Sequence, residues 1–302
     1  MRPSKRAQQY QSSGDKPMIS YDGITKSRIR FHYELSTLFY RLLWGVHIHH
    51  GLWNENESPR QAQRQLIEHL LNESGIPRGA SVVDVGCGMG GSSIHMARHH
   101  DCHVTGITLS GMQCRWAGTT AALKGVGGRT KFLRQDAETV DFADESFDYL
   151  WSVECTEHLF DKASFFKRAS RWLRPGGGVA LCIWLAGDEP HSQEDVEQVK
   201  GVCDAFLCPS LGTTEDYSTW LRNAGLEVGS ICDLTPRIMQ TWEICQRRIQ
   251  RTGLPAFARL CGRDAVKFID NFELILNAYR SGAMKYASIV AKKPQFGVAA
   301  CC

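Results

Sequence analysis

The chain has 302 residues, 43% of them hydrophobic, and a formal net charge of +3. This length and composition support one sizeable folded core, and the small charge with dispersed Lys and Arg argues against nucleic-acid binding. No apolar run reaches the roughly 20 residues that a membrane-spanning helix needs.

Of the twelve cysteines, Cys87, Cys114, Cys155 and Cys182 stand in periodic or glycine-rich segments, and no CxxC pair is present. This spacing favours neither a disulfide framework nor a structural metal site. Because no secretory signal is recognisable, we expect a cytoplasmic protein with free thiols and no metal. The basic, polar residues 1–20 are predicted to be a disordered tail, and residues 295–302 a second tail.

Residues 21–78 carry apolar and aromatic residues at three- and four-residue spacing, which predicts a helical N-terminal lid. After the break at residues 75–79, short apolar runs alternate with helical segments. The predicted strands are 80–86, 103–109, 129–137, 146–153 and 179–185, and the predicted helices are 92–100, 112–125 and 161–173. This alternation indicates an α/β fold with a parallel sheet and crossover helices.

The second half of the chain has a looser pattern. Residues 215–226 are predicted to be a helix, 226–235 a sixth strand and 285–294 the last strand. Between them, residues 236–281 are helical and aromatic, as expected for an insertion that caps an acceptor pocket. The expected division is therefore a core of residues 79–235, a cap of 236–281 and a final core segment of 282–294.

The stretch VVDVGCGMGGSS, residues 82–93, joins a strand to a helix through a glycine-rich turn. Glycines let the backbone approach a ligand at the carboxyl end of a strand, and Gly86, Gly88 and Gly91 also match the dinucleotide-binding pattern GxGxxG. Asp84, however, would repel a pyrophosphate and would suit the sulfonium and ammonium groups of S-adenosylmethionine. No carboxylate follows about 20 residues later to bind a ribose, which also disfavours a dinucleotide.

Two further segments belong to the same sheet. Asp136 ends the third predicted strand, where a carboxylate can accept a hydrogen bond from an adenine amino group; the alternative is a surface aspartate that caps a turn. The run RPGGG, residues 174–178, is predicted to be a tight turn into the fifth strand.

The strings DVGCGMGGSS, GITLSGMQ, QDAE, WSVECTEH, DKASFFKRA and PGGG resemble class I methyltransferases. They are most similar to the group of gamma-tocopherol methyltransferases, coclaurine-type N-methyltransferases and sterol C-methyltransferases, over roughly residues 30 to 292. This resemblance implies a Rossmann-like, doubly wound, seven-stranded sheet, S-adenosylmethionine as methyl donor and a small, largely apolar acceptor of secondary metabolism.

Position by position, the resemblance implies that the cofactor lies against Asp84, Gly86, Cys87, Gly88, Gly90, Thr108, Leu109, Gln113, Asp136 and Ala137. Most methyltransferases carry an acid after the second strand, and this chain lacks it. Gln113 has a second explanation, because Ser110-x-x-Gln113 has the spacing of a helix capping box. The two roles are compatible.

Glu154, Glu157 and His158 follow the fourth strand and would share one face if the segment is helical. Two carboxylates and an imidazole near a cationic cofactor can accept a proton or hold a cation. In the resembling N-methyltransferases this ExxEH string binds and deprotonates an amine, and in the tocopherol type it would face a phenol. The alternative for Glu154 is an acid that the dipole of a helix N-terminus favours.

The run WGVHIHHGLW, residues 44–53, contains three histidines. A metal site is disfavoured because His47 and His49 diverge on a helix and no cysteine or carboxylate pair completes a ligand set. The resembling enzymes have a similar run as a lid over the site. We therefore expect Trp44, His49 and His50 in the substrate pocket, with Trp242 of the cap as a second wall; the alternative is packing alone. Tyr21, Tyr33 and Tyr40 are equal candidates to reach the cofactor.

The sequence therefore predicts an S-adenosylmethionine-dependent methyltransferase whose acceptor is a phenolic isoprenoid or terpenoid carbon, or an alkaloid-type amine. One alternative is a non-catalytic cofactor-binding protein with a Rossmann-like fold. Another is a nicotinamide oxidoreductase, which the missing ribose-binding acid disfavours. Neither the identity of the acceptor nor the oligomeric state follows from the sequence.

Overall fold

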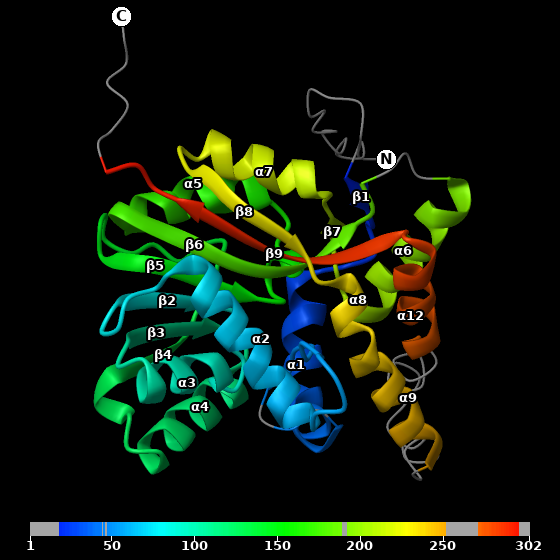
Figure 1. The fold of residues 1–302 in the computed structure, drawn as a ribbon, viewed down its shortest axis with the longest axis horizontal. Coiled ribbons are helices and arrows are strands. Elements are labelled where there is room, and N and C mark those ends of the chain that lie inside the picture. The colour runs from blue at the N-terminus through cyan, green and yellow to red at the C-terminus, as the bar shows by residue number, and fades with distance from the viewer. Residues whose placement is uncertain (1–17, 44, 46, 189–191, 252–270, 296–302) are drawn as a thin grey trace, which may run out of the picture.

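The computed structural model describes residues 18–43, 45, 47–188, 192–251 and 271–295. Its centre is a seven-stranded sheet in the order β4-β3-β2-β5-β6-β9-β8 (Figure 1). The strands are β2 (Ser81–Val85), β3 (His103–Thr108), β4 (Thr130–Arg134), β5 (Phe147–Val153), β6 (Leu173–Ala186), β8 (Glu227–Asp233) and β9 (Met284–Lys292). The pairs from β4 to β6 are parallel, and β9 runs antiparallel to β6 and β8. The expected Rossmann-like seven-stranded α/β sheet is confirmed.

The strand order reverses beside β2. From β2 the chain continues outward to β3 and β4 on one side, and it then returns to build β5 and β6 on the other. Ligands of doubly wound sheets bind in the crevice at the carboxyl ends of the strands at such a switch point. In this chain the switch point brings the ends of β2 and β5, and thus Asp84 and Glu154, to the same edge.

The sheet is buried on both faces, as its continuous apolar strands require. Because side chains alternate along a strand, β6 sends Ala180, Cys182 and Trp184 into one hydrophobic cluster and Leu181 and Ile183 into the other. Helix α2 (Pro59–Ser74) belongs to the first cluster, and helices α5 (Lys162–Trp172) and α7 (Thr214–Asn223) belong to the second.

The other helices complete the layers around the sheet. Those next to β2, β3 and β4 are α3 (Gly91–His99) and α4 (Gly111–Leu123); those beyond β6 and β9 are α6 (Gln193–Phe206), α8 (Thr235–Ile238), α9 (Gln240–Arg251) and α12 (Phe272–Ser281). In Figure 1 the second group stands apart from the first, and α1 (Lys26–Leu43) lies between them.

The segment expected as a lid divides into two parts. Helix α2 packs against β6 and β9 and buries Leu66, Ile67 and Leu70 in the main core. Helix α1 instead packs on α4, close to the carboxyl edge of the sheet. Only α1 and the loop after it therefore have the position of a lid.

Several local elements differ from the sequence-based expectations. Ile19–Ser20, inside the predicted tail, forms β1, which pairs with β7 (Ser210–Leu211). The RPGGG run is part of β6 rather than a separate turn, and the pairing of β5 with β6 shifts register there. Helix α6 was not predicted, although Ser192 and Asp195 form a capping box at its start. Residues 252–270 of the expected cap lie outside the described residues. Within the described ranges, no helix is long and apolar enough to cross a membrane.

Candidate active site

Three adjoining pockets lie along the carboxyl edge of the sheet. The loop pocket is lined by Asp84, Gly86, Gly88 and Met89, with His47 and His49 opposite. The Asp136 pocket is lined by Gly86, Thr108, Leu109, Asp136, Ala137 and His158. The aromatic pocket is lined by His50, Glu154, Glu157, Trp184, Phe206 and Trp242. His49 borders the first and third pockets, and His158 borders the second and third.

Asp84 sits near the end of β2, almost fully buried. Ser93 Oγ of α3 donates to its Oδ2 at 2.5 Å. Burial raises the pKa of Asp84 to about 7, because the hydrogen bond from Ser93 only partly offsets the loss of water. A cation bound beside Asp84 would restore its ionised form, so this residue fits a positively charged ligand.

The glycine turn brings the backbone close to the segment that follows β5. Gly86 has φ = 79°, and a Cβ on it would lie 2.3 Å from the Cys155 side chain. Cys87, Gly88 and Met89 border the same pocket, while Gly90 is the N-cap residue of α3 at φ = 80°. The turn can therefore lie this close to Cys155 only because Gly86 carries no side chain.

Gly86→Ala is expected to destabilise the ligand-free protein by about 3 kcal/mol, from left-handed backbone strain and overpacking together. Gly75→Ala is the matched control, since Gly75 has φ = 64° and open space around it; backbone strain alone predicts about 1 kcal/mol. Urea unfolding of both variants measures the difference. Equal destabilisation would show that the contact between Gly86 and Cys155 is not tight.

The end of β3 is organised by α4 and α1. Thr108 Oγ1 donates to Gln113 Oε1 at 2.8 Å, and Ser110 Oγ accepts from the Gln113 backbone N–H at 3.2 Å. Ser110 therefore caps α4, but the Gln113 side chain bonds Thr108 rather than returning to Ser110. Glu34 of α1, which no sequence pattern singled out, accepts from the backbone N–H of Gly111 at 2.7 Å and of Met112 at 3.1 Å.

Glu34 thus places a carboxylate at the positive end of α4, beside the strand end that lacks an acid. Burial tends to raise the pKa of Glu34, but the backbone hydrogen bonds outweigh it and hold the pKa below its usual range. No sequence motif marks Glu34, because it reaches this position through the packing of α1 on α4.

Asp136 and Ala137 line the second of these pockets. Lys26 Nζ of α1 lies 2.6 Å from Asp136 Oδ2 and 3.0 Å from Glu138 Oε2. The other oxygen of Asp136 accepts from the Glu138 backbone N–H at 2.9 Å, so it also caps the turn. Both oxygens of Asp136 thus have a partner, and Lys26 ties α1 across this pocket; the contact of Asp136 with adenine stays a prediction.

Glu154 follows β5 in a left-handed conformation, with φ = 53°. Its Oε1 accepts three hydrogen bonds of 2.8 Å, from the His50 backbone N–H, from His50 Nδ1 and from the Tyr286 hydroxyl. Burial tends to raise the pKa of Glu154, but the interactions with His50 outweigh it and lower the pKa. Glu154 is therefore an ionised carboxylate that holds the loop after α1 against the sheet.

Glu157 differs from Glu154 both in its hydrogen bonds and in its protonation state. It lies in a short 3₁₀ turn, Thr156–His158, and its Oε1 accepts from the Trp184 backbone N–H at 2.5 Å. Its Oε2 is buried and has no hydrogen-bond partner among the described residues. Burial raises the pKa of Glu157 to about 8, so at neutral pH this carboxyl keeps its proton and can donate a hydrogen bond inside the aromatic pocket.

His158 uses both ring nitrogens. Nδ1 donates to the Leu207 carbonyl at 3.0 Å, which leaves Nε2 to accept from the Tyr33 hydroxyl at 2.8 Å. Burial lowers the pKa of His158, so the ring is neutral. Tyr33 is thus joined to this motif, whereas the side chain of Tyr40 lies outside the described part of the chain.

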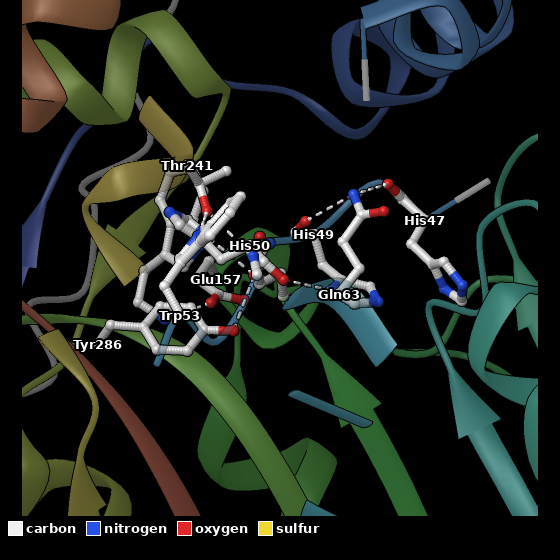
Figure 2. A network of polar contacts seen from close by, with 11 residues as sticks. His47, His49, His50, Trp53, Gln63, Glu157, Thr241 and Tyr286 are labelled. Atoms are coloured by element: carbon white, nitrogen blue, oxygen red, sulfur yellow. Dashed lines mark hydrogen bonds and ion pairs between the residues drawn. The ribbon is translucent and has the colours of Figure 1, made fainter. Parts of the chain in front are cut away.

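The three histidines of the loop after α1 separate into two places. The His47 ring packs on Gly91 at the start of α3, whereas His49 and His50 line the aromatic pocket. Figure 2 shows His50 grouped with Trp53, Glu157 and Tyr286, and His47 on the other side of Gln63. Trp44 lies outside the described residues, and Trp242 of α9 lines the aromatic pocket beside His50; its contact with an acceptor stays a prediction.

Potential metal ligands converge elsewhere. In the described part of the chain, the groups of three that lie close enough to share an ion are Glu68, His95 and His100, and His69, Glu73 and Cys232. His95 and His100 both contact one Glu68 oxygen, Oε1, at 2.5 and 3.2 Å, which accounts for the first group by hydrogen bonding. None of the three loop histidines belongs to either group.

Known proteins match most of the chain. The family described as Mycolic acid cyclopropane synthetase matches residues 24–285. The chloroplastic tocopherol O-methyltransferase of Arabidopsis thaliana is 30% identical over 91% of this chain and 84% of its own length. The 27-O-demethylrifamycin SV methyltransferase of Amycolatopsis mediterranei is 31% identical over 83% of this chain and 92% of its own. A cyclopropane synthase structure from Mycobacterium tuberculosis has a TM-score of 0.79 at 20% identity, covering 90% of this chain and all of that one.

Proposed function

Because the chain belongs to the mycolic acid cyclopropane synthetase family and is an S-adenosylmethionine-dependent methyltransferase, we propose that its acceptor is a small apolar molecule with a reactive hydroxyl group, such as a prenylated phenol. The observation that carries the proposal is the aromatic pocket, which combines apolar walls with buried polar atoms that lack a partner among the described residues. The identity of the acceptor and the roles of individual residues are part of this proposal.

The loop pocket and the Asp136 pocket suit the methyl donor. Asp84 would face its cationic amino-acid portion, the backbone of the glycine turn would border the ribose, and Asp136 with Ala137 would flank the adenine. Thr108, Leu109 and Gln113 lie between these regions. When bound, the donor supplies a methyl group that is already activated on a sulfonium, so the protein's main task is to position the acceptor.

The aromatic pocket suits a flat, apolar acceptor. Trp184, Phe206 and Trp242 meet edge to face, with ring centroids 5.3 to 6.0 Å apart, and such walls bury aromatic and isoprenoid surface well. Inside this wall, His50 Nε2, Glu157 Oε2 and Trp184 Nε1 have no hydrogen-bond partner within the described ranges. Buried polar groups without partners cost stability, so an acceptor with a hydroxyl group would complement these atoms.

The names of the relatives support the same class of acceptor. Tocopherol is a prenylated phenol, and the name of the 27-O-demethylrifamycin SV methyltransferase places its methyl transfer on an oxygen. In our proposal Glu157, as a neutral carboxyl, donates to the acceptor oxygen, while Tyr33 and His158 fix the side of the pocket that faces the Asp136 pocket. Helix α1, tied by Lys26, would close over the bound donor.

The test is a transfer assay with methyl-labelled S-adenosylmethionine and separate panels of prenylated phenols, phenols without a side chain, aliphatic alcohols and alkaloid amines. We expect label in the prenylated phenols, with isolation of the product showing whether oxygen or a ring carbon is methylated. Label confined to amines would overturn the proposal. Absence of label together with tight binding of S-adenosylhomocysteine would favour the non-catalytic alternative for the acceptor site.

The cellular location is open to a direct check. Two relatives are named as chloroplastic, whereas the sequence led us to expect a cytoplasmic protein. Fractionation of cells that express the full chain distinguishes these locations.

A further inference from the structure

His158, the histidine of the ExxEH string, would be the first candidate for a catalytic base. Neither of its ring nitrogens is available to an acceptor. Its Nδ1 donates to the Leu207 carbonyl, and its Nε2 accepts from the Tyr33 hydroxyl. For His158 to take a proton from an acceptor, the contact with Tyr33 would have to break first. Another group of the aromatic pocket is therefore better placed to accept the proton of an acceptor.

His50 has the arrangement of an oriented base. Its Nδ1 and its backbone N–H both bond Glu154 Oε1 at 2.8 Å. Because the ionised carboxylate can only accept, Nδ1 carries a proton, and in the neutral ring Nε2 therefore carries the lone pair. Nε2 is buried in the pocket wall and has no partner among the described residues. A base held in one tautomer by a third group is the arrangement that activates hydroxyl groups in unrelated enzymes.

The surroundings keep this ring fixed and dry. Its centroid lies 4.9 Å from Tyr286, 5.1 Å from Trp242 and 5.6 Å from Trp184. The loop that carries it is anchored on both sides, because Thr241 Oγ1 accepts from Gly51 and from Trp53, and Gln63 donates to the His47 and His49 carbonyls (Figure 2). The His50 ring is therefore held in one orientation, and because Nε2 is fully buried, an acceptor reaches it where part of this aromatic wall moves aside.

His49 is the nearest rival and lacks the carboxylate. Its Nδ1 donates to the His50 carbonyl at 2.7 Å, and its Nε2 has no partner within the described ranges. Burial lowers the pKa of His49, and no carboxylate of the described residues bonds its ring to stabilise an imidazolium. Glu154 contacts His50 directly and can offset the positive charge that forms there.

We propose that His50 is the catalytic base that removes the hydroxyl proton of the acceptor, and that Glu154 is the residue that positions it. This inference rests on the proposed hydroxyl-bearing acceptor. The proton moves to His50 Nε2, the oxygen's electron pair forms the bond to the methyl carbon, and the pair of the broken carbon–sulfur bond leaves with the sulfur. If a ring carbon is methylated instead, that carbon later loses its own proton to solvent while the imidazolium returns a proton to the oxygen.

The first test compares His50→Ala and Glu154→Gln with the parent protein. We expect His50→Ala to lower kcat for the phenolic acceptor about 100-fold or more, as for loss of a general base, with S-adenosylhomocysteine affinity within about twofold. Added imidazole should restore part of the rate in His50→Ala but not in Glu154→Gln. A thiophenol analogue of the acceptor, ionised without a base, should be methylated by His50→Ala at close to the parent rate. His99→Ala, on the outer side of α3, is the unchanged control.

A rate for His50→Ala near that of the parent would overturn the inference. An equal loss of rate with phenol and thiophenol would also overturn it, because that would indicate a structural role.

A second measurement needs no turnover. A nitrophenol, which absorbs visible light when ionised, is titrated at pH 6 into protein saturated with S-adenosylhomocysteine. The parent protein should raise the ionised fraction and His50→Ala should not; no rise in the parent would also overturn the role of His50. Failure of the phenol panel with a positive nitrophenol result would count against the proposed acceptor alone.

Discussion

Replacing Asp84 with asparagine is expected to abolish tight cofactor binding while it stabilises the ligand-free protein at pH 8. The asparagine would keep the hydrogen bond from Ser93 but would lose the charge that faces the cationic donor. Removing one partner of a buried charge pair costs several kcal/mol, so affinities for S-adenosylmethionine and S-adenosylhomocysteine should fall at least about 100-fold. Calorimetric titration measures both affinities.

The stability change follows from the raised pKa of Asp84. Burial lifts the pKa to about 7 in the folded protein, whereas an unfolded chain has a value of about 3.9. Between these pH values the folded state binds more protons than the unfolded state, so Asp84 lowers stability as pH rises through this window. Asparagine has no such penalty, and the gap between variant and parent should be largest at pH 8 and vanish near pH 4.

Urea unfolding at both pH values tests this prediction. Asp144→Asn removes an exposed carboxylate of the surface and serves as the control for a change in net charge. An Asp84→Asn variant that binds S-adenosylhomocysteine like the parent would refute the cofactor role of Asp84. A variant less stable than the parent at pH 8 would show that Asp84 is ionised at no net cost in the ligand-free fold.

The second large effect is expected at Glu157, where glutamine and alanine should behave differently. Glutamine can accept from the Trp184 backbone N–H and donate from its amide, as the protonated carboxyl does. Alanine leaves that buried N–H without a partner, which costs about 1–3 kcal/mol, and it removes the donor inside the pocket. We expect Glu157→Ala to lower turnover about 100-fold, Glu157→Gln less than about tenfold, and neither to change S-adenosylhomocysteine affinity.

Stability measured over a series of pH values distinguishes the protonated form of Glu157 from the ionised form. Burial raises the pKa to about 8 in the folded protein, against about 4.3 for an unfolded chain. The protonated form therefore stabilises the fold fully below about pH 4, and that contribution is lost as pH rises toward and through 8. The parent should lose stability relative to Glu157→Gln across this range. If Glu157→Gln lost as much turnover as Glu157→Ala, Glu157 would act as an ionised carboxylate.

The local part of the site could be predicted from the sequence. The glycine turn with Asp84, the strand–helix alternation and the grouping of Glu154, Glu157 and His158 depend on short spacings, and such spacings follow from backbone geometry. The sheet and its ligand edge follow as well, since a strand–turn–helix alternation admits few topologies. The place of His50 in the pocket was expected only through the resemblance to known methyltransferases, and that of Trp242 from the aromatic residues of the predicted cap.

The protonation states and pairings were decided by the tertiary structure. His50 and Glu154 are 104 residues apart in the chain, and Tyr33 and His158 are 125 apart. Helix α1 and the following loop meet the sheet edge through packing that no local pattern records, and this packing decides which nitrogen can meet an acceptor. It also makes Glu154 ionised and Glu157 neutral, although the two stand three positions apart. The sequence determined which chemical groups reach the edge of the sheet; only the long-range contacts, and the water that they exclude, decided what each group can do there.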